Sequence, residues 1–277
     1  MKIGLIDYYL DGFHGNNYPA WIKEASSGEI QALYAYAKID SPSGGLSTNQ
    51  WCKKYNIQKL DSIEAVVEVS DGIIVLSPNN PEQHEELCRL PLESGKPVYV
   101  DKTFAETKEI AERIFTIAKK HDTPCYSSSA LRYASEFEDI DCSQIDNITS
   151  WGPGTFTEYT IHQLEPIVAM MGTGISRIMY TGTEKWPAYV CEYADGRKAA
   201  ISHHGWECPF TMAVGFYDGS TKIVKIESDL FKNFICDLVD FFRTREVKVP
   251  HEDTIAIIAA RESAIKAAKT PGKWTMV

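Results

Sequence analysis

The sequence lacks a C-x-x-C pair, and its N-terminus lacks a long apolar run. The seven cysteines are odd in number and widely scattered, so we expect reduced thiols, with neither a disulfide framework nor a metal site. Residues 1–7 form only a short apolar run that already contains an acid. This pattern excludes a signal peptide or a membrane span at the N-terminus, so we expect a cytoplasmic protein with no membrane partner.

Positive charge is also in short supply. The chain has 28 Lys and Arg against 38 Asp and Glu, a formal net charge of −10. Because polyanions are held by basic patches, we expect no nucleic-acid partner. With 277 residues, of which 44% are hydrophobic, the chain can bury a large core in one large domain or two ordinary ones.

A complete glycine fingerprint, G-x-G-x-x-G, is missing as well. The first expected strand, residues 2–7, is followed by a turn over residues 8–17 that carries glycines only at 12 and 15. Two tyrosines and an aspartate stand where a diphosphate favours small residues, which argues against a standard dinucleotide site. Asp7, at the end of the strand, and Gly12, in the turn, are the candidates here for contact with a cofactor.

Strands and helices alternate through the first half of the chain. Short apolar runs predict strands, and amphipathic or capped segments between them predict helices. The expected strands are 2–7, 30–37, 72–77, 96–100 and 124–128, and the expected helices are 18–25, 48–55, 62–69, 82–93 and 106–120. This alternation predicts an α/β fold, a doubly wound parallel (Rossmann-like) sheet over residues 1–128.

The end of the second expected strand bears on the choice of cofactor. An acid there would accept the ribose hydroxyls of NAD, whereas a base would meet the extra phosphate of NADP. The sequence offers both, Lys38 and Asp40, so the choice between NAD and NADP stays open.

The pattern changes after residue 128. Short strands are expected at 175–183, 188–193, 198–203, 211–216 and 222–226, separated by turn signals, and helices at 231–243 and 251–269. We therefore expect a second domain over residues 129–277, of α+β type with a mainly antiparallel sheet. Pro166 cannot donate to the carbonyl of His162, so a helix in this region is expected to begin near Gln163 or to kink.

Three local patterns resemble the glucose–fructose oxidoreductase and inositol dehydrogenase family, Gfo/Idh/MocA. Residues 75–84 are similar to its strand that ends in a proline–asparagine turn, with a histidine opening the next helix. Residues 95–103 resemble its Gly-Lys-x-Val strand leading into Glu-Lys-Pro, here Asp-Lys-Thr. Residues 158–172 resemble its second-domain segment with an acid four residues before a histidine.

The resemblance implies an NAD(P)-dependent oxidoreductase that moves a hydride between a sugar-like or polyol hydroxyl and nicotinamide. By this likeness, Lys102 would polarise the hydroxyl, His162 would take its proton and Glu158 would orient the imidazole. Pro78 and Asn79 would line the cofactor together with Lys102. The expected partners are a small-molecule substrate and further copies of the chain, in a homodimer or homotetramer built through the sheet of the second domain.

The alternative is a family member that has lost redox chemistry and binds a small molecule or partner in its interdomain crevice. The turn over residues 8–17 separates the two hypotheses, since its tyrosines and His14 could fill the space of a phosphate or pack against a neighbouring subunit. His203 and His204 fall on opposite faces of a strand and cannot share a metal. Trp186, Trp206 and Phe210 are expected to be sheet packing rather than a sugar-stacking platform.

Overall fold

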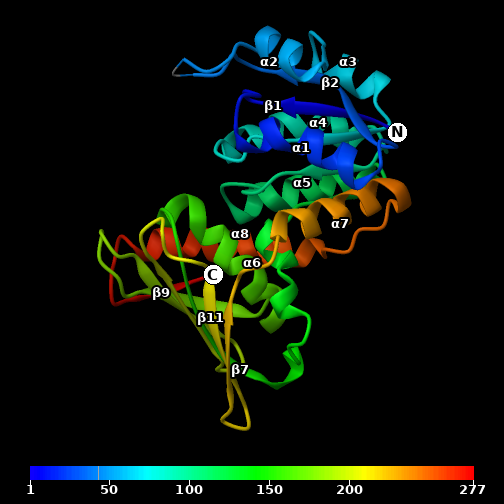
Figure 1. The fold of residues 1–277 in the computed structure, drawn as a ribbon. Helices are drawn as coiled ribbons and strands as arrows, with labels where there is room; N and C mark the ends of the chain where they lie inside the picture. Colours follow the sequence, from blue (N-terminus) through cyan, green and yellow to red (C-terminus); the bar gives the residue numbers. More distant parts are fainter. Residues whose placement is uncertain (43) are drawn as a thin grey trace. The chain divides into compact units, whose positions relative to one another are not determined.

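The computed structural model describes residues 1–42 and 44–277 (Figure 1). Contacts between Cα atoms divide the chain into two units. Unit 1 comprises residues 1–128 and 232–251, and unit 2 comprises residues 129–231 and 252–277.

Unit 1 contains a six-stranded sheet in the order β3-β2-β1-β4-β5-β6. Its strands are β1 (Lys2–Asp7), β2 (Gln31–Ala37), β3 (Gln58–Lys59), β4 (Gly72–Val75), β5 (Val98–Val100) and β6 (Cys125–Tyr126). All neighbouring strands run parallel. The predicted doubly wound sheet is confirmed, and the order reverses between β1 and β4, where such sheets bind ligands at the carboxyl ends of their strands.

The helices of unit 1 begin at side-chain caps where the sequence supplies Ser or Thr. They are α1 (Phe13–Ala25), α2 (Thr48–Tyr55), α3 (Ile63–Val69), α4 (His84–Glu93), α5 (Lys108–Lys120) and α7 (Leu230–Thr244). Ser47 and Gln50 close a reciprocal capping box at α2, which explains its start at Thr48. Ser62 and Thr107 accept the corresponding amide at α3 and α5.

Helix α1 begins five residues earlier than the sequence predicts. Gly12, in an extended conformation, is its N-cap, and Pro19 lies inside the helix instead of in its first turn. Pro19 leaves one carbonyl of the helix without an amide donor, but the fully buried Tyr18 and Ile22 hold the helix against the sheet. The predicted start at residue 18 is therefore wrong.

Helix α7 packs within unit 1, although the sequence assigns everything after residue 128 to the second domain. The ring of Phe234 lies 5.8 Å from that of Tyr18 and 5.4 Å from that of Tyr99. Phe241 meets Tyr126 edge to face at 4.8 Å. These aromatic contacts explain why residues 232–251 group with the first 128 residues.

Unit 2 contains a seven-stranded sheet in the order β12-β11-β7-β10-β9-β8-β13. Its strands are β7 (Ile145–Gly152), β8 (Ile175–Tyr180), β9 (Ala188–Tyr193), β10 (Lys198–His203), β11 (Thr211–Phe216), β12 (Thr221–Lys225) and β13 (Trp274–Met276). Only the pair β7 and β10 is parallel, so the mainly antiparallel sheet is confirmed. The sequence did not predict β7 or β13.

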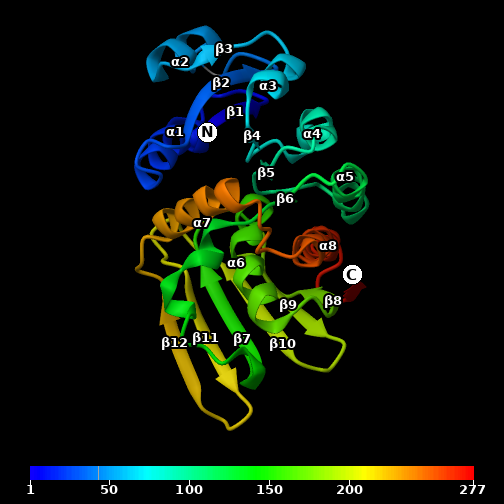
Figure 2. The same ribbon diagram turned by 90° about the vertical axis from the view of Figure 1, so that its right-hand side faces the viewer.

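Helices α6 (Phe156–Met171) and α8 (His251–Ala267) complete unit 2, and Figure 2 shows α6 lying along the sheet. Arg261 of α8 donates to the carbonyl of Thr157 on α6, at 3.1 Å from Nε and 2.9 Å from Nη2. Helix α6 runs through Pro166, so the predicted start near Gln163 is wrong. His162 lies in the middle of a continuous helix rather than at a helix entrance.

Candidate functional site

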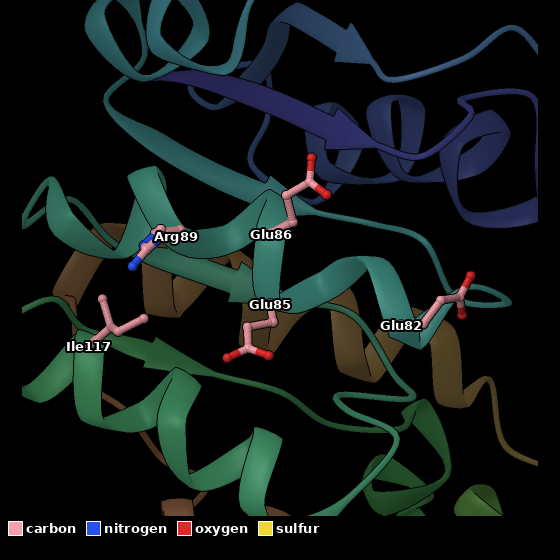
Figure 3. Close-up of a pocket in the computed structure, with 5 residues that line it drawn as sticks. All are labelled: Glu82, Glu85, Glu86, Arg89 and Ile117. Atoms are coloured by element: carbon pink, nitrogen blue, oxygen red, sulfur yellow. The ribbon is translucent and has the colours of Figure 1, made fainter.

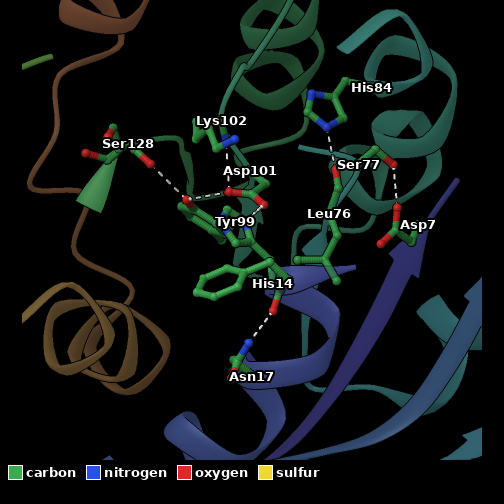
Figure 4. Close-up of polar contacts among 12 residues, drawn as sticks. Asp7, His14, Asn17, Leu76, Ser77, His84, Tyr99, Asp101, Lys102 and Ser128 are labelled. Atoms are coloured by element: carbon green, nitrogen blue, oxygen red, sulfur yellow. Dashed lines mark hydrogen bonds and ion pairs between the residues drawn. The ribbon is translucent and has the colours of Figure 1, made fainter. Parts of the chain in front are cut away.

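The carboxyl ends of β1 and β4 meet through a buried network of hydrogen bonds (Figure 4). The hydroxyl of Ser77 donates to Oδ1 of Asp7 at 2.8 Å and accepts the backbone amide of Tyr8 at 2.8 Å. Asp7 is only 3% exposed, and this burial raises the pKa of its carboxyl to about 8. Ser77 has a φ of +74°, the left-handed region that non-glycine residues rarely occupy. Asp7 thus faces Ser77 inside the fold, and its contact with a cofactor stays a prediction.

The turn after β1 keeps two of the three fingerprint glycines. A Cβ on Gly15 would lie 2.2 Å from the carbonyl oxygen of Leu10, so glycine is required for this close approach. A Cβ on Gly12 would meet only Tyr9, at 4.0 Å, which leaves the space in front of the cap open. Leu10-x-Gly12-x-x-Gly15 therefore has the spacing of G-x-G-x-x-G, with leucine in the first place. A search for the complete fingerprint misses this partial one.

His14 links the first turn of α1 to the end of β5. Its Nδ1 pairs with Oδ2 of Asp101 (Figure 4). The imidazole ring also stacks on the ring of Tyr18, with 4.8 Å between the ring centroids. Asp101 also accepts the backbone amide of Lys102 at 2.8 Å and the hydroxyl of Tyr99 at 3.3 Å. Burial raises the pKa of Asp101, but the charge and hydrogen bond of His14 outweigh it, and the net shift is downward. Asp101 is thus a buried carboxylate that fixes the backbone at Lys102.

Lys102 lies two residues after the end of β5 and is half-buried. The peptide bond between Lys102 and Thr103 is cis. Val75 of β4 pairs with Val100 of β5, so the Pro78-Asn79 turn and Lys102 follow neighbouring strands of one sheet. In that turn Pro78 is half-buried and Asn79 is exposed.

His84, the histidine of the proline–asparagine motif, ties these two strand ends together. Its side chain is fully buried, with Nδ1 lying 3.0 Å from the carbonyl oxygen of Phe104 and Nε2 in contact with that of Leu76. Burial lowers the pKa of this imidazole. His84 therefore supports the loops that carry Asn79 and Lys102 and does not face a ligand itself.

The two side chains expected to choose between NAD and NADP both have protein partners. Nζ of Lys38 lies 2.6 Å from Oε2 of Glu86 and 3.1 Å from Oε1 of Gln83. Oδ1 of Asp40 accepts the amide of Thr48 at 2.7 Å, which lowers the pKa of that carboxyl. Asp40 thus supports the start of α2. Lys38 forms an ion pair with the carboxylate of Glu86.

A surface pocket lies along α4 (Figure 3). It is lined by Glu82, Glu85, Glu86, Arg89 and Ile117. Three carboxylates against one guanidinium disfavour the phosphates of a dinucleotide. None of the residues predicted for the site lines this pocket, so we do not assign the cofactor to it.

In unit 2, His162 is held by a residue that the sequence did not single out. Its Nδ1 lies 2.6 Å from the hydroxyl oxygen of Ser129, a fully buried side chain that also accepts the amide of Leu131 at 3.3 Å. Glu158 is exposed, and its carboxylate accepts from Thr155 at 3.1 Å. The structure thus brings Ser129 to Nδ1 of His162, and the orienting role of Glu158 stays a prediction.

Aromatic rings surround His162. Tyr159 lies 5.0 Å and Phe210 6.1 Å from the imidazole, measured between ring centroids. Trp206 meets Tyr159 edge to face at 4.9 Å, and 64% of its surface is exposed. The expectation that Trp206 is sheet packing is therefore wrong.

Three further findings concern metal binding and membrane contact. His203 is buried and His204 exposed, as their alternation predicts, and burial lowers the pKa of His203 to about 4. No cluster of three or more metal-binding side chains occurs in residues 1–42 and 44–277. Over the same described residues, every helix is too short or too polar to cross a bilayer.

The strand order and the Leu10-x-Gly12-x-x-Gly15 turn identify unit 1 as a Rossmann-type fold. Residues 12–128 match the model of the Gfo/Idh/MocA family, described as an oxidoreductase family with an NAD-binding Rossmann fold. This match confirms the resemblance predicted from the sequence. No curated protein matches the chain.

Solved structures share the fold over both units. The scyllo-inositol dehydrogenase from Lactobacillus casei with bound NAD(H) and scyllo-inositol aligns with a TM-score of 0.79 and 14% identity, over 99% of this chain and 98% of that one. GenD2 from gentamicin A biosynthesis, in complex with NAD, aligns at 0.79 and 13% over 100% and 96%. UDP-N-acetylglucosamine 3-dehydrogenase from Acidithiobacillus ferrooxidans aligns at 0.78 and 12% over 98% and 97%. At these identities the likeness establishes a common fold.

Proposed function

We propose that the protein is an oxidoreductase that transfers a hydride between a sugar-like or polyol hydroxyl and a nicotinamide cofactor, NAD or NADP. The observation that carries the proposal is the Gly12-x-x-Gly15 turn opening α1 inside a family-matched Rossmann unit. The N-terminus of a helix presents backbone amides and a positive dipole end, which suit a diphosphate. Two of the similar structures hold NAD or NAD(H), which supports the same cofactor class.

In this proposal Lys102 and His162 act on the same hydroxyl. Lys102, with its backbone fixed by Asp101, donates a hydrogen bond that stabilises negative charge on the substrate oxygen. His162 accepts the hydroxyl proton, and the carbon–oxygen single bond becomes a carbonyl. The nicotinamide supplies the acceptor for the hydride that leaves the same carbon, since no side chain can accept one.

The same proposal places five residues at or near the cofactor. Gly12 leaves room for a phosphate at the start of α1, and Pro78 and Asn79 line the cofactor beside Lys102. Lys38, directly after β2, is placed beside the adenosine ribose. Asp7 acts through Ser77, which holds the ends of β1 and β4 together.

The first test is a fluorescence titration with NADH and with NADPH. We expect saturable binding of at least one of them, and no saturation up to millimolar concentration would overturn the proposal. Lys102→Ala and His162→Ala should each lower turnover by about 100-fold or more, because each removes a group that acts on the reacting oxygen. Their affinity for the cofactor should change much less.

Two surface substitutions serve as matched controls for these variants. Lys120→Ala and His121→Ala, at the end of α5, should leave both turnover and cofactor affinity unchanged. Full turnover in the Lys102 or His162 variant would show that the reacting site lies elsewhere.

The second candidate is a binding protein of the same fold without redox chemistry. Leu10 in the first glycine position and the bulky Tyr8 and Tyr9 favour it, because they crowd the turn that would meet a diphosphate. The titration separates the two candidates, since this one requires that neither NADH nor NADPH binds.

The proposal includes a homodimer or homotetramer formed through the sheet of unit 2. One row of outward side chains crosses six strands at paired positions and carries no charge. It consists of Met179, Val190, Ala200, Thr149, Ala213 and Ile223. Within this row the side chain of Ile223 is 63% exposed. An uncharged, mostly apolar row on an exposed sheet face favours association between subunits. Sedimentation velocity that returned only monomer at micromolar concentration would contradict this part.

A further inference from the structure

His14 lies between the two glycines of the turn that opens α1, and its side chain is turned into unit 1 (Figure 4). Only 7% of His14 is exposed, whereas 58% of the neighbouring Phe13 is exposed. The imidazole stacks on the ring of Tyr18, one turn further along α1, with 13° between the ring planes. The turn proposed to meet the cofactor thus carries a buried ionisable group on its inner side.

The partner of this imidazole is Asp101, a carboxylate that is fully buried directly after β5. Water cannot reach a buried carboxylate, so protein groups must supply its hydrogen bonds and its compensating charge. Burial raises the pKa of Asp101, but the charge and the hydrogen bond of His14 lower it, and the net shift is downward. Because an ionised carboxylate can only accept, Nδ1 of His14 donates to it.

Asp101 also binds the main chain at Lys102. Its Oδ2 pairs with His14, and its Oδ1 accepts the backbone amide of Lys102 at 2.8 Å and the hydroxyl of Tyr99 at 3.3 Å. A hydrogen bond to an ionised acceptor is shorter and stronger than one to a neutral acceptor. The backbone at Lys102 is therefore held by a carboxylate that His14 helps to keep ionised.

The alternative is a pair that only stabilises the fold. For that task two apolar side chains of similar volume serve as well, because they avoid the cost of removing two charges from water. The charged pair instead joins the two positions that the proposed function uses, the turn at Gly12 and the lysine at position 102. After burial and His14, the charge of Lys102 is the next influence on the pKa of Asp101, which it lowers. The side chain of Lys102 is thus also within electrostatic reach of this carboxylate.

We propose that His14 is a positioning residue that acts through Asp101 to hold Lys102 in the orientation needed for turnover. The inference rests on the proposed function for the role of Lys102. It adds a residue that lies far from Lys102 in the sequence, and it makes one buried pair responsible for both the turn at α1 and the lysine of the reacting site. A change at His14 should therefore alter Lys102 by way of Asp101.

Two substitutions of His14 separate its hydrogen bond from its ring. His14→Phe keeps an aromatic ring against Tyr18 but removes the donor to Asp101. His14→Asn keeps an N–H donor close to the place of Nδ1 but removes the ring. If His14 acts through Asp101, His14→Phe should disturb Lys102 and His14→Asn should not. A merely structural role predicts equal effects or the reverse order.

The first measurement needs neither a cofactor nor turnover. In protein that contains isotopically labelled lysine, NMR reads the backbone amide proton and the Cε atom of Lys102, which are assigned by their loss in Lys102→Arg. We expect both signals to move in His14→Phe and in Asp101→Asn, the amide proton upfield, because the amide loses its charged acceptor. In His14→Asn both should stay close to those of the parent protein. His121→Phe, the same substitution at the end of α5, is the matched control and should move neither signal.

Three results would overturn the inference. They are an unchanged Lys102 amide in His14→Phe, an unchanged amide in Asp101→Asn, and an equally large movement in His14→Asn. Asp101→Asn keeps the test decisive if His14→Phe does not fold, since it retains both flanking side chains and neutralises only the acceptor. Far-UV circular dichroism establishes that each variant is folded.

Kinetics give a second measure, with scyllo-inositol and D-glucose as probe substrates. For a probe that is turned over, His14→Phe should lower kcat roughly 10- to 100-fold, because a small misplacement of a reacting group costs about this much. His14→Asn should stay within about threefold of the parent protein. In the Lys102→Ala background, His14→Phe should lower turnover further by less than about twofold, since its effect requires Lys102.

The outcomes distinguish this inference from the proposed function. Equal losses from His14→Phe with and without Lys102 would overturn the inference and leave the proposed function standing. If neither NADH nor NADPH binds, the proposed function fails, but the NMR measurement still decides whether His14 holds Lys102.

Discussion

At the scale of single residues, Ser129 sets the hydrogen bonding of the candidate base. A base that acts through Nε2 keeps its proton on Nδ1, and the hydroxyl oxygen of Ser129, 2.6 Å away, can accept that proton's hydrogen bond. Ser129→Ala should therefore lower kcat/KM by about 10- to 100-fold, since hydrogen bonds to charged groups are worth about 1.5–3 kcal/mol. Ser129→Thr should restore part of the activity.

A pH profile separates positioning from a merely structural effect. Without an acceptor at Nδ1 the imidazolium is less stable, so the acid limb of kcat/KM should move to lower pH in Ser129→Ala. Glu158→Gln is the matched comparison. If Ser129 alone orients the imidazole, kcat/KM of Glu158→Gln should stay within about twofold of the parent, since Glu158 is exposed and bonded to Thr155. A larger loss in Glu158→Gln than in Ser129→Ala would show that the acid orients His162 after all.

At the scale of secondary structure, the join between β7 and α6 depends on glycine. Gly154→Ala must hold a side chain at positive φ and displace the Tyr159 ring, so it should lower the free energy of unfolding by about 2–4 kcal/mol. Gly172, at the end of α6, has a similar φ of +86° and open space around it. Gly172→Ala strains only the backbone, whose φ of +86° and ψ of −177° favour glycine, so it should cost about 1–3 kcal/mol and less than Gly154→Ala.

Urea unfolding of the two glycine variants measures both losses of unfolding free energy, and the loss should be larger in Gly154→Ala. Equal losses would mean that the Tyr159 ring yields freely and is not seated by Gly154.

Elements with a strong local signal are predictable from the sequence, and those that depend on tertiary contacts are not. The continuous apolar run of β4 and the period of α5 identify both elements. The starts of α1 and α6 are misjudged because Pro19 and Pro166 read as boundaries, whereas burial on the sheet keeps both helices continuous. Strand β7 is missed because two of its buried positions, Ser150 and Gly152, are not apolar, which breaks the alternation that indicates a strand.

Within the candidate site, some residues are predictable from local motifs and others depend on tertiary contacts. Lys102, His162 and the Pro78-Asn79 turn are found from local motifs. The contacts of His14 with Asp101 and of Ser129 with His162 join residues 87 and 33 positions apart, and no local pattern encodes them. Only the tertiary fold brings such pairs together, so a single sequence gives them no signal.

At the scale of the whole molecule, Asp7 couples global stability to pH. Its pKa is about 8 when folded and near its ordinary value of 3.8 when unfolded. Between these values the folded protein keeps a proton that the unfolded polypeptide has lost. The free energy of unfolding should therefore fall as pH rises from about 4 to 8, by up to about 1.4 kcal/mol per pH unit, and level off above 8.

Asp7→Asn removes this proton uptake. Urea unfolding at pH 5.5, 6.5 and 7.5 should show the variant gaining stability relative to the parent protein as pH rises. Asp61→Asn, whose side chain is almost fully exposed, is the control and should run parallel to the parent. A constant difference between Asp7→Asn and the parent across these pH values would show that Asp7 is ionised in the folded protein.

The return of residues 232–251 to unit 1 has a consequence for taking the molecule apart. The chain passes from one unit to the other three times, after residues 128, 231 and 251. A fragment that stopped at residue 128 would leave the rings of Tyr18, Tyr99 and Tyr126 without Phe234 and Phe241. Unit 1 is therefore not a detachable N-terminal module, because isolating it requires joining residues 232–251 to residue 128.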